Sequence, residues 1–149
     1  MGEEKRMSNN TDIITAKEIL VSGGFTCVLV KDGDVHSCSE RGVKPLLNLL
    51  DSGDSYVGYS AADKGVGKAA AFLYVLLGVS AVHACVISVP ALNVLREYGI
   101  GVTFDFSVNM IRNRTDTGYC PMEQATLGIS EPHEALVAVR AALEKLTAK

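Results

Sequence analysis

Apolar and polar positions along the first forty residues switch from helical to strand-like spacing. Residues 12–22 carry apolar side chains three and four residues apart, which predicts a helix that Thr11 or Asp12 caps. Residues 25–31 and 35–39 are strand-like runs around Asp32-Gly33-Asp34, a sequence that tolerates the positive φ angles of a tight turn. We therefore expect the two runs to pair as an antiparallel hairpin.

The middle of the chain predicts two helices of different character. Residues 43–50 form a short apolar helix with Pro45 in its first turn, and the polar residues 51–54 end it. Residues 56–60 are then extended. Residues 63–77 are apolar on almost every side, so we expect a long helix that the rest of the domain covers.

The second half predicts a strand, a helix and a second strand. Residues 82–89 are a strand, Pro90 opens a helix that Gly99 closes, and residues 102–106 are the next strand. A connection of this length implies a parallel crossover. A polar loop at 107–119 leads to a short helix at 121–127, and residues 132–146 are an amphipathic helix.

Length and composition fit one α/β domain. The chain has 149 residues, of which 48% are hydrophobic, enough for a single core. We predict a disordered tail at residues 1–10 and a domain at 11–149. We expect no targeting peptide in the polar, acidic start, and Gly78 and Ser80 interrupt the apolar run 69–88, so we expect a cytoplasmic protein and no membrane partner.

Charge and cysteine content narrow the possible partners. The net charge is −3 and the basic residues are scattered, which argues against a nucleic-acid partner. The four cysteines, at 27, 38, 85 and 120, form no C-x-x-C pair, so they imply neither a disulfide framework nor a metal site.

The order of these elements resembles the cytidine-deaminase-like fold, a three-layer α-β-α sandwich with a mixed sheet. Residues 88–98 are similar to the segment in which those enzymes carry P-C-x-x-C, but Ala91 and Val94 fill the two cysteine positions. Residues 63–68 stand where the family has His or Cys followed by glutamate. Because alanine and valine cannot ligate zinc, the resemblance implies the fold without zinc deaminase activity. We expect no metal and no cofactor.

Two further segments resemble the family called domain of unknown function 1893. They are residues 63–71, D-K-G-V-G-K-A-A-A, and residues 113–123, N-R-T-D-T-G-Y-C-P-M-E. The resemblance covers about residues 12–130. Members of the deaminase-like superfold commonly form oligomers, so it implies a homodimer or a higher homo-oligomer.

Residues 63–68 are the first candidate site. If they begin a helix, Lys64 and Lys68 lie four residues apart on one face near its N-terminus, where an anion binds well. Alternatively, Asp63 only caps the helix and both lysines point into water. A P-loop is excluded because Ala62 and Ala69 replace its glycine and hydroxyl residues.

Residues 109–123 are the second candidate site. With Pro121 at the first helical position, Cys120 is the N-cap, where unpaired N–H groups favour the thiolate form. Glu123 or His83 could accept its proton, and the loop supplies candidate ligand-binding residues: Asn109, Arg112 and Arg114. The structural alternative is a capping box, in which Glu123 reaches back to the N–H of Cys120.

These segments predict a pocket for an anionic or nucleotide-like small molecule, between the start of the buried helix near Asp63 and the Cys120 loop. Two alternatives stay open. One is a metal-free, thiol-dependent enzyme with Cys120 as nucleophile, Glu123 or Asp63 as acid-base group, and Lys68 or Arg114 holding negative charge. The other is a non-catalytic interaction protein that associates through its terminal helices.

Overall fold

Strands and helices alternate along almost the whole chain in the computed structural model, which describes residues 2–111 and 120–147. The elements in chain order are α1 (Gly2–Gly23), β1 (Cys27–Lys31), β2 (Asp34–Cys38), α2 (Lys44–Asp51), β3 (Ser60–Val66), α3 (Lys68–Leu77), β4 (Ala81–Ser88), α4 (Val89–Glu97), β5 (Gly101–Val108), α5 (Pro121–Thr126) and α6 (Pro132–Thr147).

The five strands form one mixed sheet in the order β2-β1-β3-β4-β5. β1 pairs antiparallel with both β2 and β3, whereas β3, β4 and β5 run parallel to one another. The crossovers through α3 and α4 step in the same direction across the sheet, so these two helices share one face, where they pack together. The parallel crossover predicted for residues 82–106 is confirmed.

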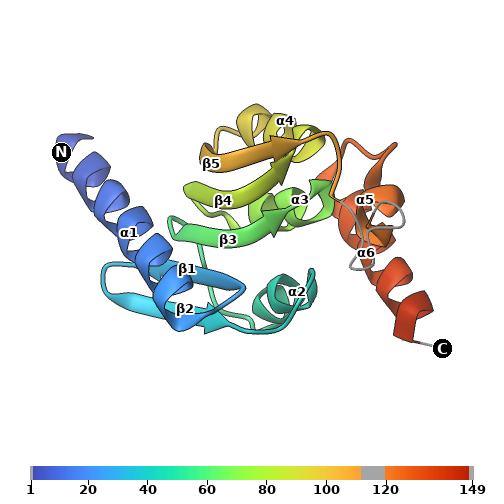
Figure 1. Cartoon of the computed structure of the whole chain (residues 1–149), viewed down its shortest axis with the longest axis horizontal. Coiled ribbons are helices and arrows are strands. Elements are labelled where there is room, and N and C mark those ends of the chain that lie inside the picture. Colours follow the sequence, from blue (N-terminus) through green and yellow to red (C-terminus); the bar gives the residue numbers. More distant parts are fainter. Residues whose placement is uncertain (1, 112–119, 148–149) are drawn as a thin grey trace.

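Two apolar cores lie on opposite faces of the sheet. The smaller one packs Ala16 and Leu20 of α1 against Val28, Val30 and Ala62. The larger one joins the other face to α2, α3 and α4, and α5 and α6 pack on α3 (Figure 1). The predicted single α/β domain, a three-layer sandwich with a mixed sheet, is therefore confirmed.

The predicted hairpin turn is also confirmed. Asp32 and Gly33 have φ angles of 48° and 88°, and Lys31 pairs with Asp34 across the turn. Two consecutive positive φ angles are the geometry of the two-residue turns that match the twist of paired strands.

The first helix begins earlier than predicted. α1 starts at Gly2, so the predicted start at Thr11 or Asp12 is wrong, and residues 2–10 are helical where we predicted a tail. The beginning of α1 extends past the sheet (Figure 1), and a projecting helical turn needs no apolar face. The apolar spacing, which guided the prediction, marks only the part of the helix that packs on the sheet.

The predicted helix 63–77 is the largest error. Residues 60–66 form β3, in the middle of the sheet, and the helix begins only at Lys68. Alanine and lysine favour a helix, but pairing with β1 on one side and β4 on the other overrides that preference. Asp63 and Lys64 therefore lie on a strand. In the described part of the chain, no helix is long and apolar enough to cross a membrane.

Candidate functional site

A pocket of about 910 Å³ opens beside the N-terminus of α2. We call it the α2 pocket. It collects residues from β1, β3, the start of α5, the end of α6 and the loop that precedes α2. Its lining residues are Thr26, Cys27, Arg41, Gly42, Val43, Lys44, Pro45, Leu46, Asp63, Lys64, Gly65, Ile111, Cys120, Pro121, Met122, Leu143 and Leu146.

The polar lining of the α2 pocket is rich in groups that attract anions. Arg41, Lys44 and Lys64 supply three cationic side chains. Val43, the N-cap of α2, makes no side-chain capping bond. The first N–H groups of a helix have no partner within the helix, and the helix dipole adds partial positive charge there. The lining of the α2 pocket therefore combines three cationic residues with a helix N-terminus, and one of the three, Lys44, also pairs with Glu40 (Nζ–Oε2 3.4 Å).

Asp63 introduces an acid into the same pocket. Its Oδ2 accepts a hydrogen bond of 2.6 Å from the Tyr74 hydroxyl group, and its Oδ1 accepts one of 3.0 Å from the N–H of Gly65. Burial raises the pKa of Asp63 to about 6, although these hydrogen bonds oppose the shift. The carboxyl group therefore changes charge close to neutral pH.

Cys27 and Cys38 lie in register with Asp63, on the next two strands of the sheet. Cys27 is the register partner of both Cys38 on β2 and Asp63 on β3, and its Sγ lies 3.1 Å from the Tyr74 hydroxyl oxygen. A hydrogen bond from the Cys27 thiol lowers the pKa of Cys38, and the same bond, together with burial, raises the pKa of Cys27. Burial also raises the pKa of Tyr74.

Glu123 is part of the scaffold. It is only 2% exposed, and its Oε1 accepts a hydrogen bond from the N–H of Lys68, at the start of α3. Its Oε2 accepts one of 2.9 Å from the N–H of Ile111. The predicted capping box is wrong, because the N–H of Cys120 donates to the Ile111 carbonyl oxygen. Glu123 caps α3 instead of its own helix.

Lys68 does not line the α2 pocket. Its Nζ donates a 2.9 Å hydrogen bond to the carbonyl oxygen of Leu127 and lies 5.8 Å from the centre of the Phe72 ring. Lys64 is on β3, so the predicted pair of lysines on one helix face is wrong. Only Lys64 of the two reaches the pocket.

Cys120 lines the α2 pocket and is the N-cap of α5, as predicted, but its side chain makes no capping bond. His83 is placed elsewhere. Its Nδ1 lies 2.7 Å from Thr103 Oγ1 and its Nε2 lies 3.5 Å from Asp105 Oδ1. His83 pairs in register with Ala62, which faces α1, so it lies on the opposite face of the sheet from Cys120. Burial, aided by Lys17, lowers the pKa of His83.

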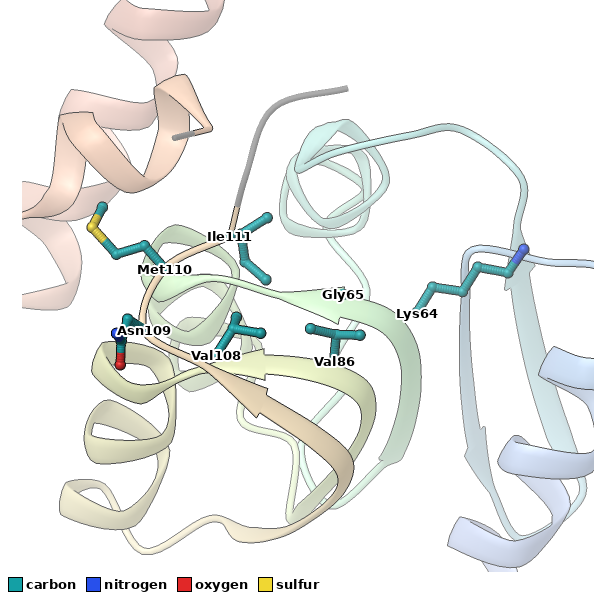
Figure 2. Close-up of a pocket in the computed structure, with 7 residues that line it drawn as sticks. All are labelled: Lys64, Gly65, Val86, Val108, Asn109, Met110 and Ile111. Atoms are coloured by element: carbon teal, nitrogen blue, oxygen red, sulfur yellow. The ribbon is translucent and has the colours of Figure 1, made fainter. Parts of the chain in front are cut away.

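A second, smaller pocket of about 600 Å³ borders the first at the carboxyl ends of the parallel strands. We call it the sheet pocket. Figure 2 shows Val86, Val108 and Ile111 gathered in it, while Lys64 extends away from them. Asn109 lines this pocket and not the α2 pocket. Lys64, Gly65 and Ile111 line both.

Gly65 lines both pockets and borders open space. A Cβ atom built there would meet no atom within 4 Å, so a larger side chain at this position would project into the space that the pockets share. Gly67 differs, because a Cβ atom there would lie 2.8 Å from Glu123 Oε1. Gly65 therefore leaves open space at the edge of both pockets, and Gly67 leaves room for the α3 cap.

The sequence missed three of the polar residues that shape the site. Arg41 and Lys44 precede or begin a short helix that had no role in the prediction, and Tyr74 looked like one more apolar position of the core helix. The signal in the sequence that could have marked α2 as a binding element is Val43 at its N-cap, because valine cannot supply the side-chain hydrogen bond that usually caps a helix. Arg112 and Arg114, predicted to bind a ligand, lie outside the described residues. Within the described residues, no three His, Cys, Asp or Glu side chains are grouped to hold a metal ion.

Comparison with solved structures finds proteins that differ in how similar they are to this chain. The chain is similar to dCMP deaminase from the cyanophage S-TIM5 in its apo form, with 15% identity, a TM-score of 0.42, and coverage of 67% of this chain and 96% of that one. It is also similar to a diaminohydroxyphosphoribosylaminopyrimidine deaminase/5-amino-6-(5-phosphoribosylamino)uracil reductase from Thermotoga maritima, with 16% identity and a TM-score of 0.42, over 68% and 37% of the two chains. Similarity at this level says nothing of substrate or reaction.

A DUF1893 family protein from Thermotoga maritima is much more similar. Its crystal structure matches with a TM-score of 0.80 and 27% identity, over 91% of this chain and 90% of that one. No curated protein matches the chain in sequence. The family model described as a domain of unknown function, DUF1893, matches residues 15–143. The chain therefore belongs to the DUF1893 family.

Proposed function

We propose that the chain binds an anionic small molecule of nucleotide-like size in the α2 pocket. The observation that carries the proposal is that Arg41, Lys44 and Lys64 line one pocket of about 910 Å³ together with the uncapped N-terminus of α2. Pockets of about 300–1,000 Å³ that combine apolar walls with a few convergent polar groups are typical of small-molecule sites. The anionic group would lie at the α2 N-terminus.

Asp63 favours a ligand that also carries a hydrogen-bonding group. When protonated, this carboxyl group can both donate and accept, and when ionised it accepts only. It would contact a part of the ligand away from the anionic group, since its own negative charge repels an anion. The apolar walls around Val43, Leu46 and Met122 would hold the rest of the ligand.

Binding is a better proposal than thiol catalysis. Cys120 lines the pocket, but both oxygens of Glu123 accept hydrogen bonds from the backbone, and His83 faces the other side of the sheet. Neither is therefore positioned as a proton acceptor for Cys120. Of the acid-base groups proposed for Cys120, Asp63 is the one that lines the pocket in the described part of the chain.

The direct test is thermal denaturation of the full chain with a panel of nucleoside monophosphates, sugar phosphates and carboxylates. A ligand that binds only the folded state raises the Tm in a saturable way. The proposal requires such a shift for at least one anion, and a loss of roughly tenfold in affinity on Lys64→Ala or Arg41→Ala. Arg96→Ala, on the exposed end of α4, is the matched control. Equal affinity in all three variants would sink the proposal.

A further inference from the structure

The two cysteines of the β1-β2 hairpin are direct partners across the strands. Cys27 pairs with Cys38 in the antiparallel register. Directly opposed residues of antiparallel strands place their side chains on one face, with Cα atoms about 4.5–5.5 Å apart. A disulfide requires Cα atoms about 4.4–6.8 Å apart, so the spacing of directly paired residues is compatible with a disulfide between these two.

The two thiols differ in access. Cys27 is 3% exposed on a strand with a neighbour on each side. Cys38 is partly exposed at the end of β2, the edge strand of the sheet. A small reagent in solution therefore reaches Cys38 and not Cys27.

The two thiols also differ in chemistry. The Cys27 thiol donates a hydrogen bond that stabilises the thiolate of Cys38, which lowers the pKa of Cys38 and raises that of Cys27. The thiolate is the nucleophilic form of cysteine. Access and electrostatics thus assign the attacking role to the same residue.

We propose that Cys27 and Cys38 form a redox-active dithiol site that reacts with a small-molecule disulfide. The Cys38 thiolate attacks one sulfur of the reagent, a mixed disulfide forms, and the other half of the reagent leaves as a thiolate. Cys27 then loses its proton to solvent and attacks Cys38 Sγ, which releases the second half. The two cysteines lose two electrons and the reagent gains them as two thiols.

The oxidised form has a consequence for the neighbouring side chains. In a Cys27–Cys38 disulfide the Cys27 sulfur carries no hydrogen and no charge, so its contact with the Tyr74 hydroxyl group changes, while Tyr74 keeps its bond to Asp63. The redox state of the hairpin is therefore in contact with the α2 pocket. The dithiol reaction itself needs no ligand in that pocket.

The test exposes the reduced full chain to glutathione disulfide and maps the products by tryptic digestion without reduction. Trypsin separates residues 18–31, which contain Cys27, from residues 32–41, which contain Cys38. We expect a cross-linked pair of these two peptides, lighter than their sum by two hydrogens, while Cys85 and Cys120 bear no internal cross-link. A cross-link that joins Cys85 or Cys120 instead, or no cross-link at all, would overturn the proposal.

Two variants separate the roles of the thiols. In Cys27→Ser, Cys38 should accumulate as a stable mixed disulfide with glutathione, because the second step is lost. In Cys38→Ser, Cys27 should stay unmodified. Circular dichroism establishes that each variant is folded, and Cys27→Ala replaces Cys27→Ser if the serine disturbs the core. Modification of Cys27 in folded Cys38→Ser, or an unmodified Cys38 in a folded Cys27 variant, would contradict the assignment.

Discussion

Glu123 holds together segments that lie far apart in the sequence. One carboxylate accepts from the N–H of Lys68 at the start of α3 and from the N–H of Ile111 just beyond β5, while its own helix follows Cys120. Gly67 leaves the space that this carboxylate fills. Glu123, which was predicted to be catalytic, therefore has a structural role, because its two hydrogen bonds join the start of α3 to the segment after β5.

Glu123→Ala should cost stability. It leaves two partly buried backbone N–H groups without an acceptor. A fully buried group of this kind costs about 1–3 kcal/mol, and partial burial places these two in the lower half of that range. We expect the free energy of unfolding to fall by about 2–4 kcal/mol, measured by urea denaturation. Glu97→Ala, on the exposed end of α4, is the control and should change it by less than about 0.5 kcal/mol. Equal effects of the two substitutions would show that the cap of α3 is not structural.

Asp63 should make stability depend on pH. Its pKa in the folded chain is about 6, above the ordinary value of 3.8, so the folded state holds its proton more tightly than the unfolded state. This carboxyl group therefore costs no stability below about pH 4. The cost grows as the pH rises from about 4 to about 6, and above that it is complete.

Asp63→Asn isolates this effect. The variant should be more stable than the original chain at pH 7–8, by about 1–3 kcal/mol, and the two should converge near pH 4. His83, whose pKa is lowered, acts in the opposite direction over part of this range, but it is present in both proteins and cancels from the difference. Urea denaturation across pH 4–8 measures the difference in the free energy of unfolding between the two proteins. A constant difference would contradict the raised pKa of Asp63.

At the scale of the element, β3 contributes Asp63, Lys64 and Gly65 to the α2 pocket from one stretch of strand. Gly65→Val tests this arrangement, because valine favours a strand and its side chain would enter the space between the two pockets. We expect the Tm without ligand to stay within a few degrees and ligand affinity to fall by roughly tenfold or more. Unchanged affinity in the folded variant would show that the ligand does not reach β3.

The sequence predicted the elements that are bounded by strong local signals. Pro90 and Gly99 delimit α4, and Asp32-Gly33 forms the turn of the β1-β2 hairpin. Proline restricts the backbone angles and glycine permits positive φ angles wherever they occur. Residues 60–66 carry no such signal. Their alanines and lysine suit a helix, and pairing with two neighbouring strands, one of them 21 residues further along the chain (Ser60 pairs with Ala81), makes them a strand.

For the candidate site too, the sequence revealed residues that stand in local motifs and missed those that only the packing of distant segments brings together. Asp63, Lys64 and Cys120, which the sequence marks as candidates, line the α2 pocket, and their roles in binding or catalysis stay predictions. Arg41 and Lys44 were missed, because they join the site only through the packing of α2 beside β1 and β3. Lys68 and Glu123 were assigned to chemistry, but their hydrogen bonds to Leu127 and to two backbone N–H groups are contacts between distant segments that no local spacing reveals.

At the scale of the whole molecule, the predicted homo-oligomer remains a proposal, and two exposed apolar regions support it. Phe106 on the edge strand β5 is 69% exposed and Val137 on α6 is 70% exposed, and large exposed apolar side chains favour association when they are contiguous. If the chain associates through β5, Phe106→Glu should shift sedimentation velocity toward the monomer, whereas Val137→Glu should do so if α6 is the interface. A monomer at every concentration of the original chain would exclude both.

The measurement that tests the central claim most directly is an NMR titration of the full chain with sulfate, a small dianion whose charge is constant between pH 5 and 8. If the α2 pocket holds an anion, the backbone amide signals of Lys44 and Leu46 should shift in a saturable way, and Lys64→Ala should weaken that response while Arg96→Ala leaves it intact. Shifts that never saturate, or that spread over exposed lysines and arginines without involving the start of α2, would contradict an anion site there.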